Sequence, residues 1–190
     1  TYNTVAGRGS MTAAVTNNYN IAIGNSTLIN LTTGANNTAI GNTTNAVNVT
    51  TGSNNVSVGT NTRVGATSNS NVSIGTNVGS GTLSSYNVGI GSNIMANTSA
   101  ALVGNVAIGR GVLNNAGLTA SNTVAVGYNS LSALTTGTGN TAVGDNSGIT
   151  ISTGASNTLF GSQTRVGATT SNNTIIGASA GAFTLGSSNV

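Results

Sequence analysis

Side chains that carry out chemistry are nearly missing from this 190-residue chain. It contains no histidine, cysteine, lysine or glutamate, and its one acidic side chain is Asp145. Acid–base and glycosidase catalysis need paired ionisable groups, and no base is present to activate the many serine and threonine hydroxyls. Transition metals lack imidazole and thiolate ligands. We therefore expect a protein that is not an enzyme and that needs no cofactor.

Charge is equally scarce. Charged residues make up 3% of the chain, whereas a typical soluble domain has about 25%. The net charge of +3 comes from four arginines, which form no cluster. A phosphate backbone is followed by clustered lysine and arginine, so nucleic-acid binding is not expected. No apolar run reaches the roughly 18 residues of a membrane span, and we expect no membrane insertion of this segment.

Proline is absent too, although sequences that stay disordered are often rich in it. Glycine, asparagine, serine and threonine supply much of the chain, and valine and isoleucine recur among them at regular intervals. This regularity indicates ordered β structure and not a disordered segment.

A five-residue motif, Asn-[Val/Thr/Ile]-x-[Ile/Val]-Gly, recurs from one end of the chain to the other. Clear copies occupy residues 20–24, 37–41, 55–59, 71–75, 87–91, 105–109, 140–144 and 173–177, and looser copies begin at residues 3, 123 and 157. Successive motif glycines lie 16 to 18 residues apart. Such a short period predicts a solenoid, in which each rung buries its apolar residues against its neighbours.

Within the motif, β-branched residues at positions two and four alternate with a small residue at position three. This alternation predicts a short strand with Val and Ile on one face and Ala, Ser or Gly on the other. The closing glycine suits a corner with positive φ, and stacked asparagines form hydrogen-bonded ladders. The expected ladder residues are Asn20, Asn37, Asn55, Asn71, Asn87, Asn105, Asn140, Asn157 and Asn173, with Gly24, Gly41, Gly59, Gly75, Gly91, Gly109, Gly127, Gly144, Gly161 and Gly177.

The second half of each repeat predicts a weaker strand, for example at residues 46–49, 63–66, 148–151 and 182–185. The dipeptide Asn-Gly, the strongest hairpin signal, never occurs, so parallel stacking of the rungs is favoured over hairpins. The expected fold is an all-β parallel β-solenoid of about eleven rungs of about 17 residues, each with two short strands. With strands about 4.8 Å apart, it would be roughly 50 Å long.

The small third position of the motif would let neighbouring chains approach closely on the outer face. We therefore expect a homotrimer around a common axis, with a dimer as the alternative. We also expect the chain to be part of a longer fibre protein, because it begins without methionine and stops inside a repeat.

A second, longer repeat divides the chain into two tandem blocks of six rungs, approximately residues 1–102 and 103–190, the second one truncated. Arg8 and Arg110 occupy equivalent places in the two blocks, as do Arg63 and Arg165. Duplication explains these pairs; the alternative hypothesis is that Arg63 and Arg165 form rings of three in a trimer and bind anions. Four tyrosines are either isolated surface or corner residues or platforms for sugar rings: Tyr2, Tyr19, Tyr86 and Tyr128.

Residues 105–109 (Asn-Val-Ala-Ile-Gly) and 122–131 (Asn-Thr-Val-Ala-Val-Gly-Tyr-Asn-Ser-Leu) resemble the head repeats of trimeric autotransporter adhesins, the YadA-like heads. They resemble equally the Asn-Thr-Ala-[Val/Ile]-Gly repeats of bacteriophage tail fibres. The resemblance covers nearly the whole chain. It implies a left-handed parallel β-roll, trimerised into a rod that serves display and attachment. The rungs here are longer than those of the compact adhesin head, and charge is nearly absent.

The function expected on these grounds is a shaft or head segment of an extracellular trimeric fibre that attaches to a host or surface, as in a phage tail or appendage fibre. The location would be a virion appendage or a bacterial cell surface. Partners would be copies of the chain, adjoining fibre domains, and a cell-surface glycan or protein receptor. The alternative is a bacterial adhesin head that binds matrix or glycan. A remote alternative is an ice-binding solenoid, which needs a regular threonine array, whereas the threonines here drift between rungs.

Overall fold

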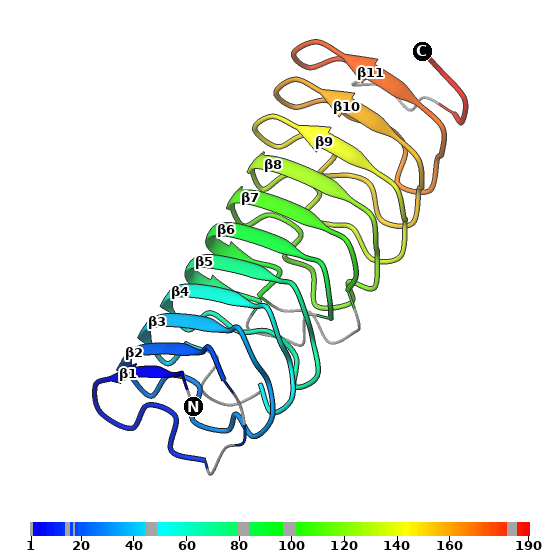
Figure 1. Cartoon of the computed structure of the whole chain (residues 1–190). Helices are drawn as coiled ribbons and strands as arrows, with labels where there is room; N and C mark the ends of the chain where they lie inside the picture. The colour runs from blue at the N-terminus through cyan, green and yellow to red at the C-terminus, as the bar shows by residue number, and fades with distance from the viewer. Residues whose placement is uncertain are drawn as a thin grey trace.

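The chain forms an elongated all-β solenoid (Figure 1). The computed structural model describes residues 2–13, 16, 18–44, 49–79, 84–96, 102–181 and 186–190. Eleven strands pair in chain order in one parallel sheet. They are β1 (Thr4–Ala6), β2 (Ile21–Asn25), β3 (Thr38–Asn42), β4 (Val56–Thr60), β5 (Val72–Val78), β6 (Val88–Ile94), β7 (Val106–Arg110), β8 (Val124–Tyr128), β9 (Thr141–Val143), β10 (Thr158–Phe160) and β11 (Thr174–Ile176). The predicted parallel β-solenoid is confirmed.

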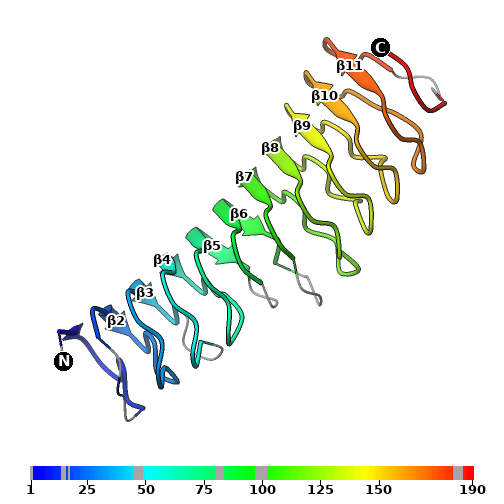
Figure 2. The same ribbon diagram turned by 45° about the vertical axis from the view of Figure 1, so that its right-hand side comes forward.

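The register of the sheet follows the sequence motif. Ala22 pairs with Ala39, and Gly24 pairs with Gly41, so each motif position lies beside the same position of the next rung. This register holds from β1 to β11, although the repeats differ in length. The connecting segments therefore absorb the variation between 16 and 18 residues. Figure 2 shows the coils one after another along a single axis, with the two termini at opposite ends.

Where the wall opposite the sheet is described, it does not contain the second strand that was predicted for each rung. Residues 63–66 and 148–151 lie in turns and irregular structure, while residues 46–48 and 182–185 fall outside the described residues. Single backbone hydrogen bonds link the rungs there, such as Leu131 N–H to the Ser147 carbonyl oxygen at 3.0 Å. Leu28 and Leu131 have φ values of 49° and 50°. Left-handed residues turn the chain and interrupt extended pairing, which explains the error.

The two faces of the strands alternate as predicted, but the prediction that the small residues face outward was wrong. Ala22, Ala39 and Ala107 are fully buried, whereas Ile23 and Ile40 are 38% and 37% exposed. The reason lies in the opposite wall, whose large side chains already fill the narrow interior. At Gly89, an added Cβ would lie 2.6 Å from Cγ1 of Val78. The strand centre therefore has room only for a small side chain over most of the rod.

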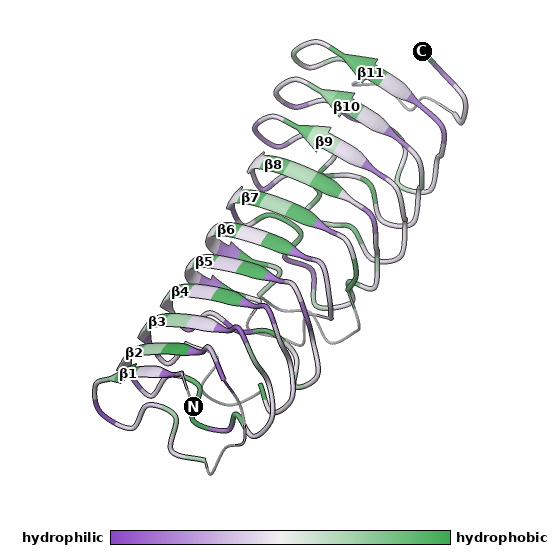
Figure 3. Cartoon of the chain, viewed as in Figure 1, coloured by the Kyte–Doolittle hydropathy of each residue, from purple (hydrophilic) through white to green (hydrophobic). Residues whose placement is uncertain are grey.

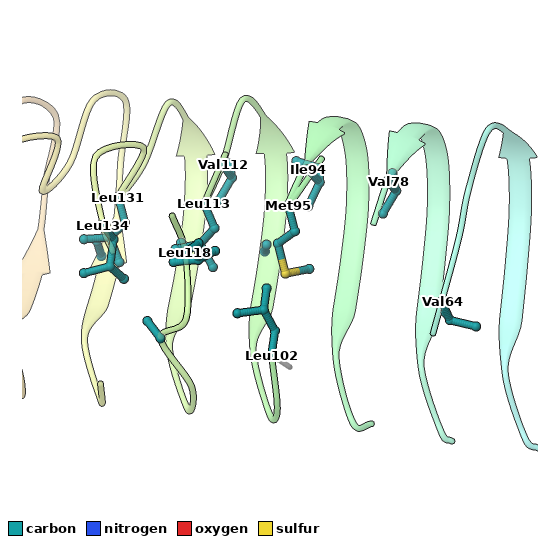
Figure 4. Packing of buried hydrophobic residues seen from close by; sticks show 14 of the residues in the cluster. Val64, Val78, Ile94, Met95, Leu102, Val112, Leu113, Leu118, Leu131 and Leu134 are labelled. Carbon is teal, nitrogen blue, oxygen red and sulfur yellow. The ribbon is translucent and has the colours of Figure 1, made fainter. Parts of the chain in front are cut away.

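The apolar core lies between the sheet and the opposite wall. Figure 4 shows Met95, Leu102 and Leu118 pointing into this space from the connecting segments. The largest fully buried side chains are Leu28, Leu31, Ile94, Met95, Leu102, Leu113, Leu118, Leu131, Leu134, Ile151 and Leu159. The described residues between Asn37 and Tyr86 contribute none of them, whereas every rung from Asn87 to Asn172 contributes at least one. Their burial depends on neighbouring rungs, as in other solenoids.

Candidate functional site

The motif asparagines form a buried ladder of hydrogen bonds along the rod. The Oδ1 atom of Asn20 accepts hydrogen bonds from the backbone N–H of Asn37 at 2.9 Å and from its Nδ2 at 3.1 Å. Nδ2 of Asn37 also donates to the carbonyl oxygen of Gly52 at 2.8 Å. The side-chain bond recurs at the other asparagine-to-asparagine steps, which pass through Asn3, Asn20, Asn37, Asn55, Asn71, Asn87 and Asn105, and through Asn140, Asn157, Asn173 and Asn189.

Thr123 interrupts the ladder. Its backbone N–H donates to Oδ1 of Asn105 at 3.0 Å, like that of the asparagines. Its hydroxyl, however, donates to the carbonyl oxygen of Ser121. The backbone N–H of Asn140 has no acceptor among the described residues. The asparagines therefore form two separate stacks, Asn3 to Asn105 and Asn140 to Asn189.

The motif glycines form a second column that only glycine can occupy. Their φ values lie between 116° and 138°, and a Cβ at Gly24 would overlap the carbonyl oxygen of Gly41. The same overlap with the next glycine occurs along the column up to Gly161. At Gly177, the nearest atom to an added Cβ is Cβ of Ala180 at 3.8 Å, and only the positive φ disfavours a side chain. The column thus fixes how closely the rungs approach.

An apolar strip runs along the outer face of the sheet, where the hydrophobic colour follows the strands (Figure 3). Positions two and four of every strand point outward and are partly or fully exposed. The fourth-position residues from β2 to β11 are Ile23, Ile40, Val58, Ile74, Ile90, Ile108, Val126, Val143, Phe160 and Ile176. Phe160 and Ile176 are 58% and 72% exposed. No charged side chain stands at positions two or four of the strands.

The structure does not bring Arg63 and Arg165 together within one chain. They occupy equivalent corners six rungs apart, and the backbone N–H of each donates to the next rung, at Val78 and Ala180. Nε of Arg63 is buried and has no hydrogen-bond partner among the described residues. Arg165 is exposed.

A column of exposed corner residues directly precedes the asparagine ladder. From Tyr19 to Ser188, each rung places this residue in the left-handed region, and most rungs use Asn, Ser or Gly there. Tyr19 and Tyr86 occupy the same position with φ values of 62° and 67°. The sequence did not single out this position, because the left-handed corner becomes visible only in the structure. Tyr128 lies elsewhere, after a motif glycine, with the guanidinium of Arg110 5.7 Å from its ring centroid.

The geometry stands alone as a guide to function. The chain matches no family model, no curated protein and no solved structure. A search of the described residues finds no enclosed pocket, and among them no helix has the length and apolarity to cross a lipid bilayer. The surfaces available for function are therefore the open faces and corners of the solenoid.

Proposed function

We propose that this chain is a shaft segment of an extracellular homotrimeric fibre that attaches to a host or surface, as in a phage tail or appendage fibre. The observation that supports it is the uncharged apolar strip along the sheet. Ten rung spacings of about 4.8 Å and a width of about 10 Å give roughly 500 Å² per chain. An apolar patch of this size is at the upper end for a monomer and is typical of an interaction surface.

In the proposed trimer, three strips meet around a common axis with left-handed coils on the outside. Three strips of roughly 500 Å² amount to about 1,500 Å² in the whole trimer, or about 500 Å² for each pair of chains, so one segment of this length supplies less than a standard stable interface. Because each rung repeats at the same spacing in every chain, side chains such as Ile74 and Ile108 meet their own copies at the same height. The scarcity of ionisable groups is compatible with a mechanical role.

The experiment is sedimentation equilibrium of the purified chain and of a variant with Ile74→Thr and Ile108→Thr. Threonine already occupies outward strand positions such as Thr38, so the fold should tolerate the change. We expect a trimer for the wild type and dissociation toward monomer for the variant. The matched control carries Thr60→Ala and Thr76→Ala, two exposed residues outside the strip. A monomeric wild type, or a variant as tightly trimeric as the wild type, contradicts the proposal.

Arg63 and Arg165 follow the strands on the wall opposite the sheet, away from the axis of this trimer, so this arrangement does not support anion-binding rings of three. The rings stay a hypothesis for a trimer with another contact face. In that case substitution of both arginines by glutamine would lower sulfate binding and remove the stabilisation that sulfate gives. Unchanged stability and unchanged sulfate binding exclude the rings.

The bacterial adhesin head is the second attachment role that fits the rod. A membrane-anchoring barrel encoded beyond this segment supports the adhesin, and a virion-attachment domain supports the fibre. Ice binding is less favoured. Contrary to expectation, threonines do align in blocks of rungs, as at Thr33, Thr51 and Thr67. The hydroxyls of the neighbouring Thr32 and Thr50, however, donate hydrogen bonds to backbone carbonyl oxygens of the next rung. Thermal hysteresis of the purified chain decides this point.

A further inference from the structure

The corner column that precedes the asparagine ladder contains tyrosines in a backbone conformation that is unfavourable for a bulky residue. A bulky residue in the left-handed region is strained, and glycine and asparagine avoid most of this strain. Tyr19 and Tyr86 accept the strain and yet remain 59% and 65% exposed. Their rings therefore recover little free energy by burial.

The second block of six rungs shows what this corner contains when no aromatic ring is present. Where the first block has Tyr2 and Tyr19, the second has Gly104 and Asn122. Gly104 and Asn122 have φ values of 70° and 56° and suit the left-handed corner. The same fold thus forms without the tyrosines, so their presence calls for a role other than stability.

The tyrosines and the residues between them form one continuous exposed edge. We name it the tyrosine corner; its residues are Tyr2, Tyr19, Asn36, Asn54, Ser70 and Tyr86. The rings of Tyr2 and Tyr19 stack with centroids 5.3 Å apart and an interplanar angle of 6°. Four rungs separate Tyr19 from Tyr86, a distance of about 19 Å along the axis. Amide and hydroxyl groups fill the interval.

We propose that the tyrosine corner binds a neutral, linear polysaccharide that lies along the rod. Tyrosine rings offer flat apolar faces with a hydroxyl at the edge, and these faces can cover the C–H face of a sugar ring. Asn36, Asn54 and Ser70 offer both donors and acceptors to the sugar hydroxyls between the rings. This inference rests on the attachment role proposed above for its purpose, although the corner is complete in a single chain.

The chemistry of the corner separates this ligand from others. Arginine, lysine and carboxylate side chains are missing from the corner, so an anionic glycan or a nucleic acid would find no counter-charge. A proline-rich peptide docks in grooves between aromatic side chains, and the described part of the chain contains no such pocket. An extended ligand on an open edge fits better than a small molecule, because small molecules are held in concave sites.

The experiment measures binding of fluorescently labelled, neutral β-linked gluco-oligosaccharides to the full chain by anisotropy. The variants are Tyr19→Asn, Tyr86→Asn and the double substitution. Asparagine suits the left-handed corner, as in Asn36 and Asn54, so the variants should melt at the same temperature as the wild type or a few degrees higher. We expect binding to weaken at least tenfold in the double variant. A loss of binding together with a gain in stability cannot be explained by unfolding.

The matched control is Tyr128→Asn, which removes an exposed tyrosine outside the corner and should leave binding unchanged. The inference is overturned if the wild type binds none of the neutral oligosaccharides, if it prefers a proline-rich peptide, or if Tyr128→Asn weakens binding as much as the double variant. Sedimentation equilibrium on the same samples separates the two proposals. A trimer that binds no glycan contradicts the tyrosine corner alone, whereas a monomer that binds glycan contradicts the trimeric shaft alone.

Discussion

Two neighbouring stretches of the rod are stabilised in different ways. The short rungs, residues 55–86, have 16 residues each, and the long rungs, residues 87–122, have 18. The described interior of the short rungs is small and partly polar, with Ser57, Thr62, Val64, Ser73 and Val78. The interior of the long rungs holds Ile94, Met95, Leu102, Val112, Leu113 and Leu118, and Figure 4 shows this contrast.

The asparagine ladder runs through both stretches. It is continuous at Asn55, Asn71, Asn87 and Asn105, and it stops at Thr123, the first residue after the long rungs. A coil with fewer residues encloses a narrower interior and buries less apolar surface. The comparison teaches that buried amide hydrogen bonds are common to both stretches, and that apolar packing adds more stability in the long rungs than in the short ones.

Removal of a leucine from the long rungs should have the largest effect. Leu118 is fully buried, and Leu118→Ala should lower the free energy of unfolding by about 2–5 kcal/mol. Val64→Ala in the short rungs removes fewer buried atoms and should cost less. Urea unfolding followed by circular dichroism measures both. Equal losses would mean that the two interiors are packed alike.

Removal of a ladder amide from the short rungs should have the next largest effect. Asn71→Ala takes away the acceptor of two buried donors of Asn87, at 2.9 and 3.2 Å. Nδ2 of Asn87 keeps the carbonyl oxygen of Leu102 as an acceptor at 2.7 Å. Its backbone N–H is left unsatisfied, and we expect a loss of about 1–3 kcal/mol. Thr123→Ala is the matched change at the interruption and should cost much less by the same unfolding assay. A similar loss at Thr123 would contradict this account of the ladder.

Repair of the interruption should stabilise the rod. Thr123→Asn supplies an acceptor for the backbone N–H of Asn140 and should raise the free energy of unfolding by about 1 kcal/mol. Amide hydrogen exchange at Asn140 should slow at the same time. Exchange as fast as in the wild type would show that the two asparagine stacks remain separate.

The smallest effect is expected from the hydroxyls inside the short rungs. The Oγ atoms of Ser57 and Ser73 are buried without a hydrogen-bond partner among the described residues. Other rungs carry alanine at this position, as at Ala39 and Ala107. Ser57→Ala and Ser73→Ala should each stabilise the chain by up to about 1 kcal/mol, measured by thermal unfolding. Destabilisation by either change would show that the hydroxyls bind a partner, such as an internal water.

The sequence was sufficient to predict the parallel stacking, because the motif recurs in phase and the register follows it. It did not reveal which strand face is buried. Ile23 looks like a core residue in any alternating pattern, and its exposure depends on how much space Leu28 and its equivalents take from the opposite wall. The second strands were predicted from local β propensity, which residues with positive φ such as Leu131 override.

The candidate sites differ in how visible they were. The ladder could be anticipated because Asn20 and its equivalents stand at a fixed place in the motif. The additional hydrogen bond from the side-chain amide to a backbone carbonyl oxygen, such as that of Gly52, could be found only in the structure. The sequence offered the tyrosines as either isolated residues or platforms for sugar rings, but it did not reveal that Tyr19 and Tyr86 share one left-handed corner, because no local pattern marks them as left-handed. The sequence feature that could have pointed to this corner is a difference between the two six-rung blocks: Tyr19 in the first block corresponds to Asn122 in the second.

The glycine column has a consequence for how such a rod can change in length. Because each motif glycine lies against the backbone of the next, as Gly24 lies against Gly41, a rung fits only above another rung with the same corner. Insertion or deletion of one complete repeat, from one motif to the next, keeps every corner matched. Insertion or deletion of a few residues within a motif would shift the glycine out of line and break the contacts between the two adjoining rungs. The length of the rod can therefore change only in whole steps of about 4.8 Å, one for each inserted or deleted rung.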